Sequence, residues 1–186
     1  MASSMRPWCM RRRIARFALS GASALLLGGC GLGETPERAS IVAVEAVAGG
    51  TALDITQRLA LSATMLEALD RGIPLRLAYR IEWCEGAGRD AEARVVELRY
   101  APLSRHYELR SLPDGETLRF ARRSALLAAL DRVRVPLQLS APACGGSVSV
   151  ALDLTALPTP LRFPAFLEPS DWRLVSPAYA WPSAPG

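Results

Sequence analysis

The chain has 186 residues, with 22 basic and 18 acidic side chains and a formal net charge of +4. Five of the basic residues, all arginines, lie within residues 1–29, where there is no acid, which leaves 17 basic residues against 18 acids. The positive charge therefore belongs to the N-terminal segment, and a nucleic-acid-binding role for the rest of the chain is excluded. The remaining length suits one domain with its own core.

The N-terminal segment has the organisation of a secretory signal. Arginines at positions 11–13 precede an apolar stretch at residues 17–27, which is too short to span a bilayer because a spanning helix needs about 20 apolar residues. The sequence LGGC at residues 27–30 resembles the lipobox of bacterial lipoproteins. This resemblance implies a diacylglyceryl thioether on Cys30, cleavage before Cys30, and acylation of the new amino terminus.

These features predict the organisation of the whole chain. Gly31 stands where an aspartate would signal retention in the inner membrane, which favours an outer-membrane lipoprotein that faces the periplasm. A plain secreted protein with an incidental cysteine is the alternative. We expect a signal peptide at residues 1–29, a lipidated cysteine and tether at 30–40, a single β-rich domain at 41–182, and a tail at 183–186.

The domain is expected to begin with a β-hairpin and a helix. Residues 41–47 are apolar and β-branched, and residues 51–59 alternate between apolar and polar side chains. Ser62 can cap a short helix, which Gly72 can end in the left-handed conformation that other residues resist.

The clearest strand follows at residues 75–83, where large apolar side chains alternate with Arg76, Arg80 and Glu82. Alternation continues at residues 96–100, and short β-type runs follow on either side of a Pro-Asp-Gly turn near residue 114. Consecutive strands with short turns predict an antiparallel meander with one buried face.

In the last third of the chain, the spacing of the apolar residues changes from the two-residue period of strands to that of a helix. Helical spacing places Leu126, Leu127, Leu130 and Val133 on one stripe of a helix that Pro136 ends. We then expect a strand that begins at Gly145-Gly146, a proline-rich crossover at residues 158–169, and a last strand at residues 172–181 that Pro177 either confines to a sheet edge or bends. The predicted fold class is mainly β with two short helices (α+β), arranged as an antiparallel β-sandwich or a curled sheet.

Four segments of the chain are similar to the sequence of a known family, and they lie at residues 72–83, 98–107, 152–161 and 172–181. They resemble a proteobacterial envelope lipoprotein family of unknown function. The resemblance implies no established activity. Genes of this family are often reported beside a sensor kinase of the nitrogen-regulation type, which implies a partner in envelope signalling. Family members typically carry more tryptophan where Cys84 stands, so this chain departs from the pattern there.

Two cysteines remain once the signal is removed and Cys30 carries lipid. Cys84 and Cys144 form an even pair in an oxidising compartment, which predicts a structural disulfide. Two buried free thiols are the alternative. Two sulfurs and one distant histidine make a poor metal site, so we expect no metal and no cofactor.

No catalytic constellation is apparent in the sequence. His106 is the only histidine, and no motif supplies it with a nucleophile and a supporting carboxylate, so we interpret it as a surface or structural residue. Four acids lie on outward faces of the predicted strands near arginines and are expected to form ion pairs. They are Glu82, Glu97, Glu108 and Asp153.

The aromatic residues allow two interpretations. The more common outcome is that they fill the core. If the sheet curls, however, Trp83, Tyr100 and Trp172 could line an apolar pocket and bind a ligand.

Two functional hypotheses follow from these features. The first is a non-enzymatic envelope lipoprotein that acts as an interaction or accessory module for a membrane-bound partner such as a sensor kinase, because tethering raises its effective concentration there. The alternative is a carrier or sensor of an apolar ligand that uses the concavity of the sheet. A hydrolase ranks last because the sequence offers no nucleophile and base.

Overall fold

A computed structural model describes residues 38–47, 51–85, 88–113, 115–137, 145–167 and 169–182. The predicted signal peptide, Cys30, Cys144 and the tail at 183–186 lie outside these residues.

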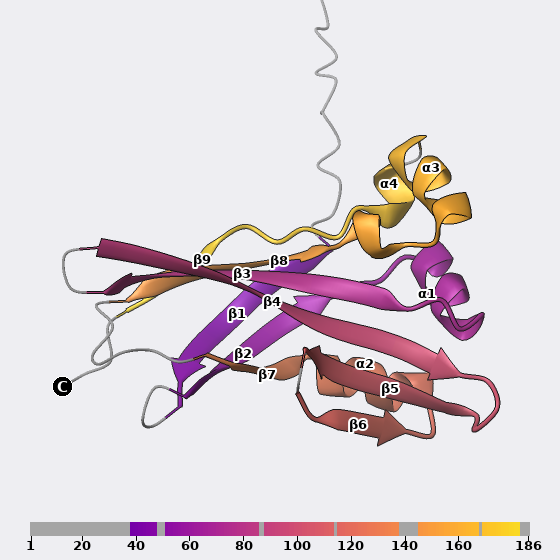
Figure 1. Cartoon of the computed structure of the whole chain (residues 1–186), viewed down its shortest axis with the longest axis horizontal. Coiled ribbons are helices and arrows are strands. Elements are labelled where there is room, and N and C mark those ends of the chain that lie inside the picture. The colour runs from indigo at the N-terminus through magenta and orange to yellow at the C-terminus, as the bar shows by residue number, and fades with distance from the viewer. Residues whose placement is uncertain are drawn as a thin grey trace, which may run out of the picture. The chain divides into compact units, whose positions relative to one another are not determined.

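Two antiparallel sheets form most of the described structure (Figure 1). The smaller sheet has the order β1-β2-β7, with β1 at Ala39–Ala46, β2 at Ala52–Leu59 and β7 at Arg132–Pro136. The larger sheet has the order β6-β5-β4-β3-β8-β9. Its strands are β3 (Leu75–Glu85), β4 (Gly88–Ala101), β5 (His106–Leu112), β6 (Thr117–Phe120), β8 (Gly146–Leu152) and β9 (Tyr179–Trp181). The mainly β, antiparallel fold class is confirmed.

Strand β3 lies in the middle of the larger sheet and follows the predicted alternation. It pairs with β4 along its whole length and with β8 over residues 77–83. Its apolar side chains all point inward, because exposing any of them would forfeit about 1.5–3 kcal/mol of burial. These are Leu75, Leu77, Tyr79, Ile81 and Trp83, none more than 8% exposed.

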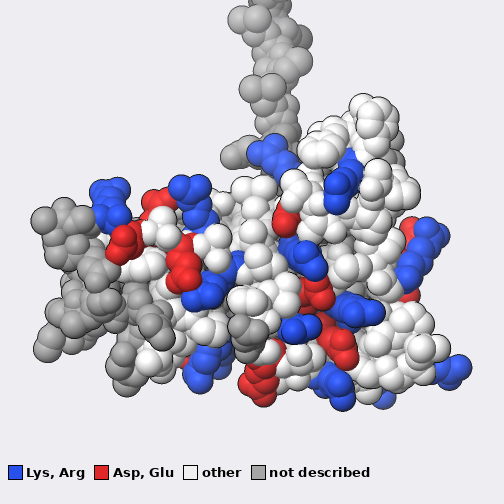
Figure 2. Space-filling model, viewed as in Figure 1, with Lys and Arg blue, Asp and Glu red and all other residues white. Residues whose placement is uncertain are grey.

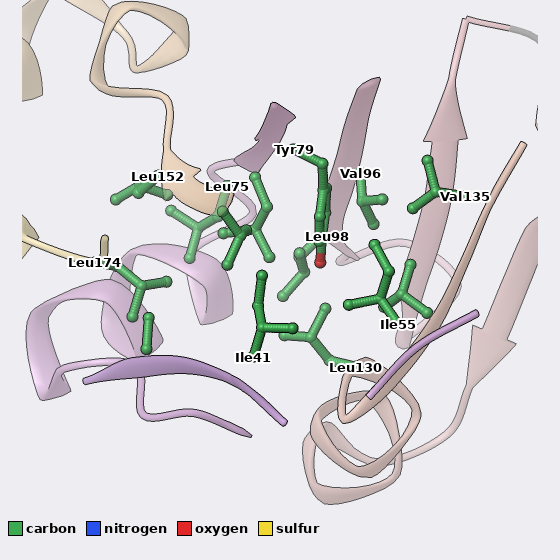
Figure 3. Close-up of a cluster of buried hydrophobic side chains, with 14 of the residues drawn as sticks. Ile41, Ile55, Leu75, Tyr79, Val96, Leu98, Leu130, Val135, Leu152 and Leu174 are labelled. Atoms are coloured by element: carbon green, nitrogen blue, oxygen red, sulfur yellow. The ribbon is translucent and has the colours of Figure 1, made fainter. Parts of the chain in front are cut away.

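The two sheets enclose one hydrophobic core. Figure 3 shows Ile41 and Ile55 of the smaller sheet and Tyr79 and Leu98 of the larger sheet reaching into the same interior. Leu130, the last residue of helix α2 (Arg123–Leu130), lies beside them. The sheets are also joined by a buried polar contact. The amide of Gln57 donates to the Tyr79 hydroxyl at 2.7 Å and to the Leu130 carbonyl at 2.8 Å. This contact fixes β2, β3 and the end of α2 against one another.

Helices α1 (Ala63–Asp70) and α2 (Arg123–Leu130) pack against the sheets as the sequence predicts. The hydroxyl of Ser62 accepts the amide N–H of Met65, which confirms the predicted cap. Gly72 has a φ of +83°, and the chain turns there through bonds from the amides of residues 72 and 73 to carbonyls in the last turn of α1.

The predicted second helix extends too far. Helix α2 ends at Leu130, and Val133 lies on β7 rather than on the helical stripe. The run from Arg132 to Pro136 alternates exposed arginines with buried valines, and it pairs with β2. Residues 132–136 form a strand because their buried residues recur every two positions and because an edge of β2 is available for pairing.

The expectation for the C-terminal segment also needs correction. The proline-rich crossover, for which no helix is expected, is largely helical, and the predicted strand at 172–181 forms only at β9, at the sheet edge. Proline is tolerated at Pro160 because the first turn of a helix leaves its N–H groups without partners. The helices are η1 (Leu154–Ala156), α3 (Thr159–Leu167) and α4 (Pro169–Trp172), so the described chain has more short helices than the two expected.

Candidate functional site

An open hollow of about 620 Å³ lies where α1, β5 and the start of α2 meet. It combines charged, aromatic and aliphatic side chains from segments that are far apart in sequence. The lining residues are Leu66, Asp70, Tyr107, Ala121, Arg122, Arg123, Ser124 and Leu127. We refer to it below as the Asp70 hollow.

Asp70 connects the walls of the hollow through its two carboxylate oxygens. The Tyr107 hydroxyl donates to Asp70 Oδ1 at 2.8 Å, and the guanidinium of Arg123 donates to Asp70 Oδ2. The ring of Tyr107 packs against Tyr100, with the ring centroids 4.8 Å apart. Partial burial, the hydrogen bond to Asp70 and the negative charge of Asp70 all raise the pKa of Tyr107 above its usual value. Tyr107 is therefore neutral near pH 7 and serves as a hydrogen-bond donor.

The charged side chains of Asp70 and Arg123 each lie at the end of a helix. Asp70 is the last residue of α1, and Arg123 is the first residue of α2. Each charge is unfavourable at that helix end because it has the same sign as the local end of the helix dipole. Pairing them across the hollow offsets this cost and ties α1 to α2.

The lining of the Asp70 hollow offers hydrogen-bonding, charged and apolar groups. Both carboxylate oxygens of Asp70 accept hydrogen bonds. The exposed Arg122 stands beside Leu66 and Leu127, so the hollow presents a cation next to apolar surface. Arginine and tyrosine beside apolar side chains are typical of protein-binding surfaces.

The three aromatic residues with a predicted ligand role are spread through the fold. Trp83 and Tyr100 lie toward opposite ends of the β3–β4 ladder, because Trp83 pairs with Asp90, ten positions before Tyr100 on β4. Trp172 is 4% exposed in α4 and belongs to the core. Only Trp83 lines a described hollow, one of about 290 Å³, whose other lining residues are Glu82, Cys84, Arg89, Gly145, Gly146 and Ser147.

Cys84 lies at the end of β3, next to the segment that leads into β8. Its Sγ is 3.4 Å from the carbonyl oxygen of Gly145, and its amide N–H donates to the same oxygen at 3.3 Å. Gly145 directly follows Cys144 in the sequence, so the described backbone is compatible with the expected disulfide. Because Cys144 is outside the described residues, the disulfide stays a prediction.

The polar residues singled out in the sequence lie mainly in surface ion pairs. Arg76 bonds Glu97 across the β3–β4 ladder at 2.8 Å. His106 Nε2 lies 2.8 Å from Glu108, which also lies 3.5 Å from Arg119 on the neighbouring strand. Glu82 pairs with Arg80 of its own strand at 2.9 Å. Figure 2 shows basic and acidic side chains interspersed over the face of the molecule in view.

Asp153 differs from the expected ion pair. Its Oδ1 accepts the amide N–H of Thr155 at 2.9 Å and the Thr155 hydroxyl at 2.6 Å. Asp153 therefore caps η1 at the point where β8 ends.

Two surface carboxylates stabilise the folded state less as the pH becomes acidic. The hydrogen bond from Arg134 lowers the pKa of Asp54, and the hydrogen bond from His106 lowers the pKa of Glu108. A folded-state pKa below the unfolded value means that the ionised carboxylate stabilises the fold above about pH 4. This stabilisation is lost as the pH falls through the lower folded-state values.

We therefore expect the thermal unfolding midpoint to fall progressively as the pH is lowered below about 5. Arg134→Gln removes the main cause of the shift at Asp54 and should flatten part of this decrease. Differential scanning fluorimetry across an acid pH series measures the effect, with Arg58→Gln, an exposed arginine of β2, as the control. If the unfolding midpoint falls by the same amount at acid pH in the wild type, Arg134→Gln and Arg58→Gln, the proposed contribution of Asp54 is contradicted.

The described residues contain no group of three or more His, Cys, Asp or Glu side chains arranged to hold a metal ion. Within the same ranges, none of the helices has the length and apolar character needed to cross a bilayer.

A protein-family model described as "Domain of unknown function (DUF4390)" matches residues 38–182. No curated protein and no solved structure matches the chain. The family match covers all the described residues and the whole Asp70 hollow.

Proposed function

The chain belongs to the DUF4390 family of domains of unknown function, and on this premise we propose that it is a lipid-tethered envelope protein that acts as a non-enzymatic interaction module. The observation that carries the proposal is the LGGC sequence at residues 27–30, which follows a basic and then an apolar segment. Acyl chains on Cys30 would hold the domain at the membrane and facing the periplasm, with the outer membrane favoured.

The partner-binding surface that we propose is the Asp70 hollow. Its exposed Arg122 and the neighbouring leucines can receive a partner segment that carries an acidic residue beside apolar ones. The ion pair between Asp70 and Arg123 holds the walls in place before binding, so little ordering is needed when the partner arrives.

Tethering favours a partner in the same membrane system. Tethering confines the domain to the periplasmic side of the envelope, which raises its effective concentration for a partner exposed in that compartment, so modest contacts suffice. The family resemblance suggests an envelope signalling protein such as a sensor kinase as this partner.

The alternative, a carrier or sensor of an apolar ligand, draws on the hollow beside Trp83. The indole Nε1 of Trp83 is buried and has no hydrogen-bond partner among the described residues, so this donor beside the hollow is unsatisfied. We rank this function second because Glu82, Arg89 and Ser147 give that hollow a polar lining.

Reversal of one charge tests the proposed surface. In cells that express the full chain, chemical crosslinking followed by mass spectrometry should link the wild type to a specific envelope protein. Arg122→Glu should abolish this crosslink, because the new carboxylate repels the acidic partner segment. The variant is expected to fold, since a negative charge is favourable at the N-terminus of α2.

Arg58→Glu is the matched control, because Arg58 is an exposed arginine of β2 that lines neither hollow. It should keep the crosslink at the wild-type level. Equal crosslinking of wild type and both variants would exclude the Asp70 hollow as the binding surface.

A further inference from the structure

Helix α3 has apolar side chains on two opposite faces. Leu161 and Ala165 are one turn apart and pack against the core, with Ala165 fully buried. Phe163, Phe166 and Leu167 lie on the other side of the helix and are 71%, 63% and 67% exposed. A helix packed on a single core needs only one apolar face, so the outer face is unpartnered in the described structure.

This outer face is unusual for the protein surface. Large apolar side chains occur singly on most surfaces, whereas two phenylalanines and a leucine within five positions of one short helix form a cluster. Figure 2 shows the surface over α3 and α4 as mostly uncharged, with basic side chains near it. Such a cluster is typical of a surface that is covered in the functional state.

The chain enters the domain beside this helix layer. Arg38, a residue of the predicted tether and the first described residue of the chain, donates from Nη1 to the carbonyl oxygen of Ser170 in α4 at 2.7 Å. Helix α3 packs against α4, and α4 is bound in turn to α1. That second contact includes a hydrogen bond of 2.6 Å from the Ser62 hydroxyl to the carbonyl oxygen of Asp171. The root of the tether and the outer face of α3 therefore belong to one connected layer.

The length of the tether limits how far this layer can lie from the membrane. Cys30 and Arg38 are eight residues apart, and a fully extended chain spans at most about 3.5 Å per residue, or about 28 Å. An acylated Cys30 would thus keep Arg38 and its neighbours α3 and α4 close to the bilayer surface.

We propose that the outer face of α3 inserts into the interfacial region of the bilayer, with Phe163, Phe166 and Leu167 below the headgroups. This inference rests on the proposed lipid tether. Bulky apolar side chains on a helix that lies in the membrane plane bind at this depth, with basic residues around them facing the lipid phosphates. Arg38, Arg162 and Arg173 are placed for that role, although the sequence also puts one acid, Glu168, in this segment.

The neighbouring side chains leave these arginines able to reach phosphate. Arg162 uses its Nε to donate to the carbonyl of Leu157 at 2.6 Å, and Arg38 uses one Nη for Ser170. A guanidinium carries five N–H groups, so each arginine retains donors for a headgroup. The one described carboxylate of α4, that of Asp171, accepts from the Thr64 hydroxyl at 2.9 Å.

Insertion can be measured with a tryptophan reporter. The full chain with Phe166→Trp is purified from its host in lipidated form and reconstituted into vesicles of phosphatidylethanolamine and phosphatidylglycerol. The added emission, taken as the difference from wild type, should shift to the blue and lose most of its intensity when brominated phospholipids replace part of the lipid. Phe163→Trp should behave in the same way and serves as a second reporter.

Leu118→Trp is the control, because Leu118 is exposed on β6 at one edge of the larger sheet, while α3 follows β8 near the other edge (Figure 1). Its emission should be unaffected by the brominated lipids. Acylated protein with no quenching at either α3 reporter would overturn the inference and would favour a protein partner on this face. Mass spectrometry of the same sample reports acylation of Cys30 separately, so a failure of the tether is distinguished from a failure of insertion.

Discussion

In cells that express the Cys30→Ser variant, we expect the protein to carry no fatty-acid label and to be lost from the membrane fraction. The serine hydroxyl cannot form the thioether that the lipobox resemblance implies for Cys30. Several acyl chains make a lasting anchor at about 0.8 kcal/mol per buried methylene, so their loss removes the main hold on the membrane. Metabolic labelling with an alkyne-tagged fatty acid, followed by fractionation, measures both effects.

Cys9→Ser is the matched control, because Cys9 lies in the predicted signal peptide and should be removed with it. This variant should be labelled and retained like the wild type. Unchanged membrane retention of the Cys30→Ser protein, with no label in the wild type, would mean that the protein is held by other contacts.

Loss of the expected disulfide is predicted to have the largest effect on stability. Cys84→Ser should lower the free energy of unfolding by about 4 kcal/mol, because the bond would close a loop of about 60 residues and restrict the unfolded chain. For a domain of this size, a change of that magnitude lowers the melting temperature by roughly 10 °C. Chemical denaturation under oxidising conditions gives the free energy directly.

A cycle of variants separates the disulfide from ordinary packing losses. Cys144→Ser and the double variant should be destabilised as much as Cys84→Ser, since each change breaks the same bond. A reductant should lower the melting temperature of the wild type and leave that of the double variant unchanged. Additive single effects with no response to reductant would show two separate thiols.

The sequence predicts the central strands well because their signal is local. In β3, five large inward apolar residues alternate with three charged residues and one alanine, and no helical arrangement can bury that pattern on one face. The turn at Gly72 is similarly local, since its φ of +83° favours glycine.

The errors occur where distant partners decide the structure. Strand β7 has only five residues, and its alternation becomes decisive only when β2 offers an edge. Helix α3 contains two prolines, so the sequence predicts no helix there, but Leu161 and Ala165 gain burial against the core in the helical form.

The Asp70 hollow could not be predicted for the same reason. Asp70 and Arg123 are 53 positions apart, and neither belongs to a motif. The one local signal is that each charge has the unfavourable sign for its helix end, which indicates a compensating partner without identifying it. The structure supplies that partner and places Tyr107 beside it.

The proposed function and the further inference assign different roles to two parts of the molecule. We propose that the layer of α3 and α4 beside Arg38 faces the membrane and that the Asp70 hollow between α1, β5 and α2 receives a protein partner. Both roles depend on the domain being held at the membrane by its amino terminus.

The most direct test is the mass of the mature N-terminal peptide, isolated from the membrane fraction of the host. We expect this peptide to begin at Cys30 and to carry the additional mass of a diacylglyceryl group and an amide-linked acyl chain. A mature protein that begins at any other residue and carries no lipid would contradict the tether and both roles that follow from it.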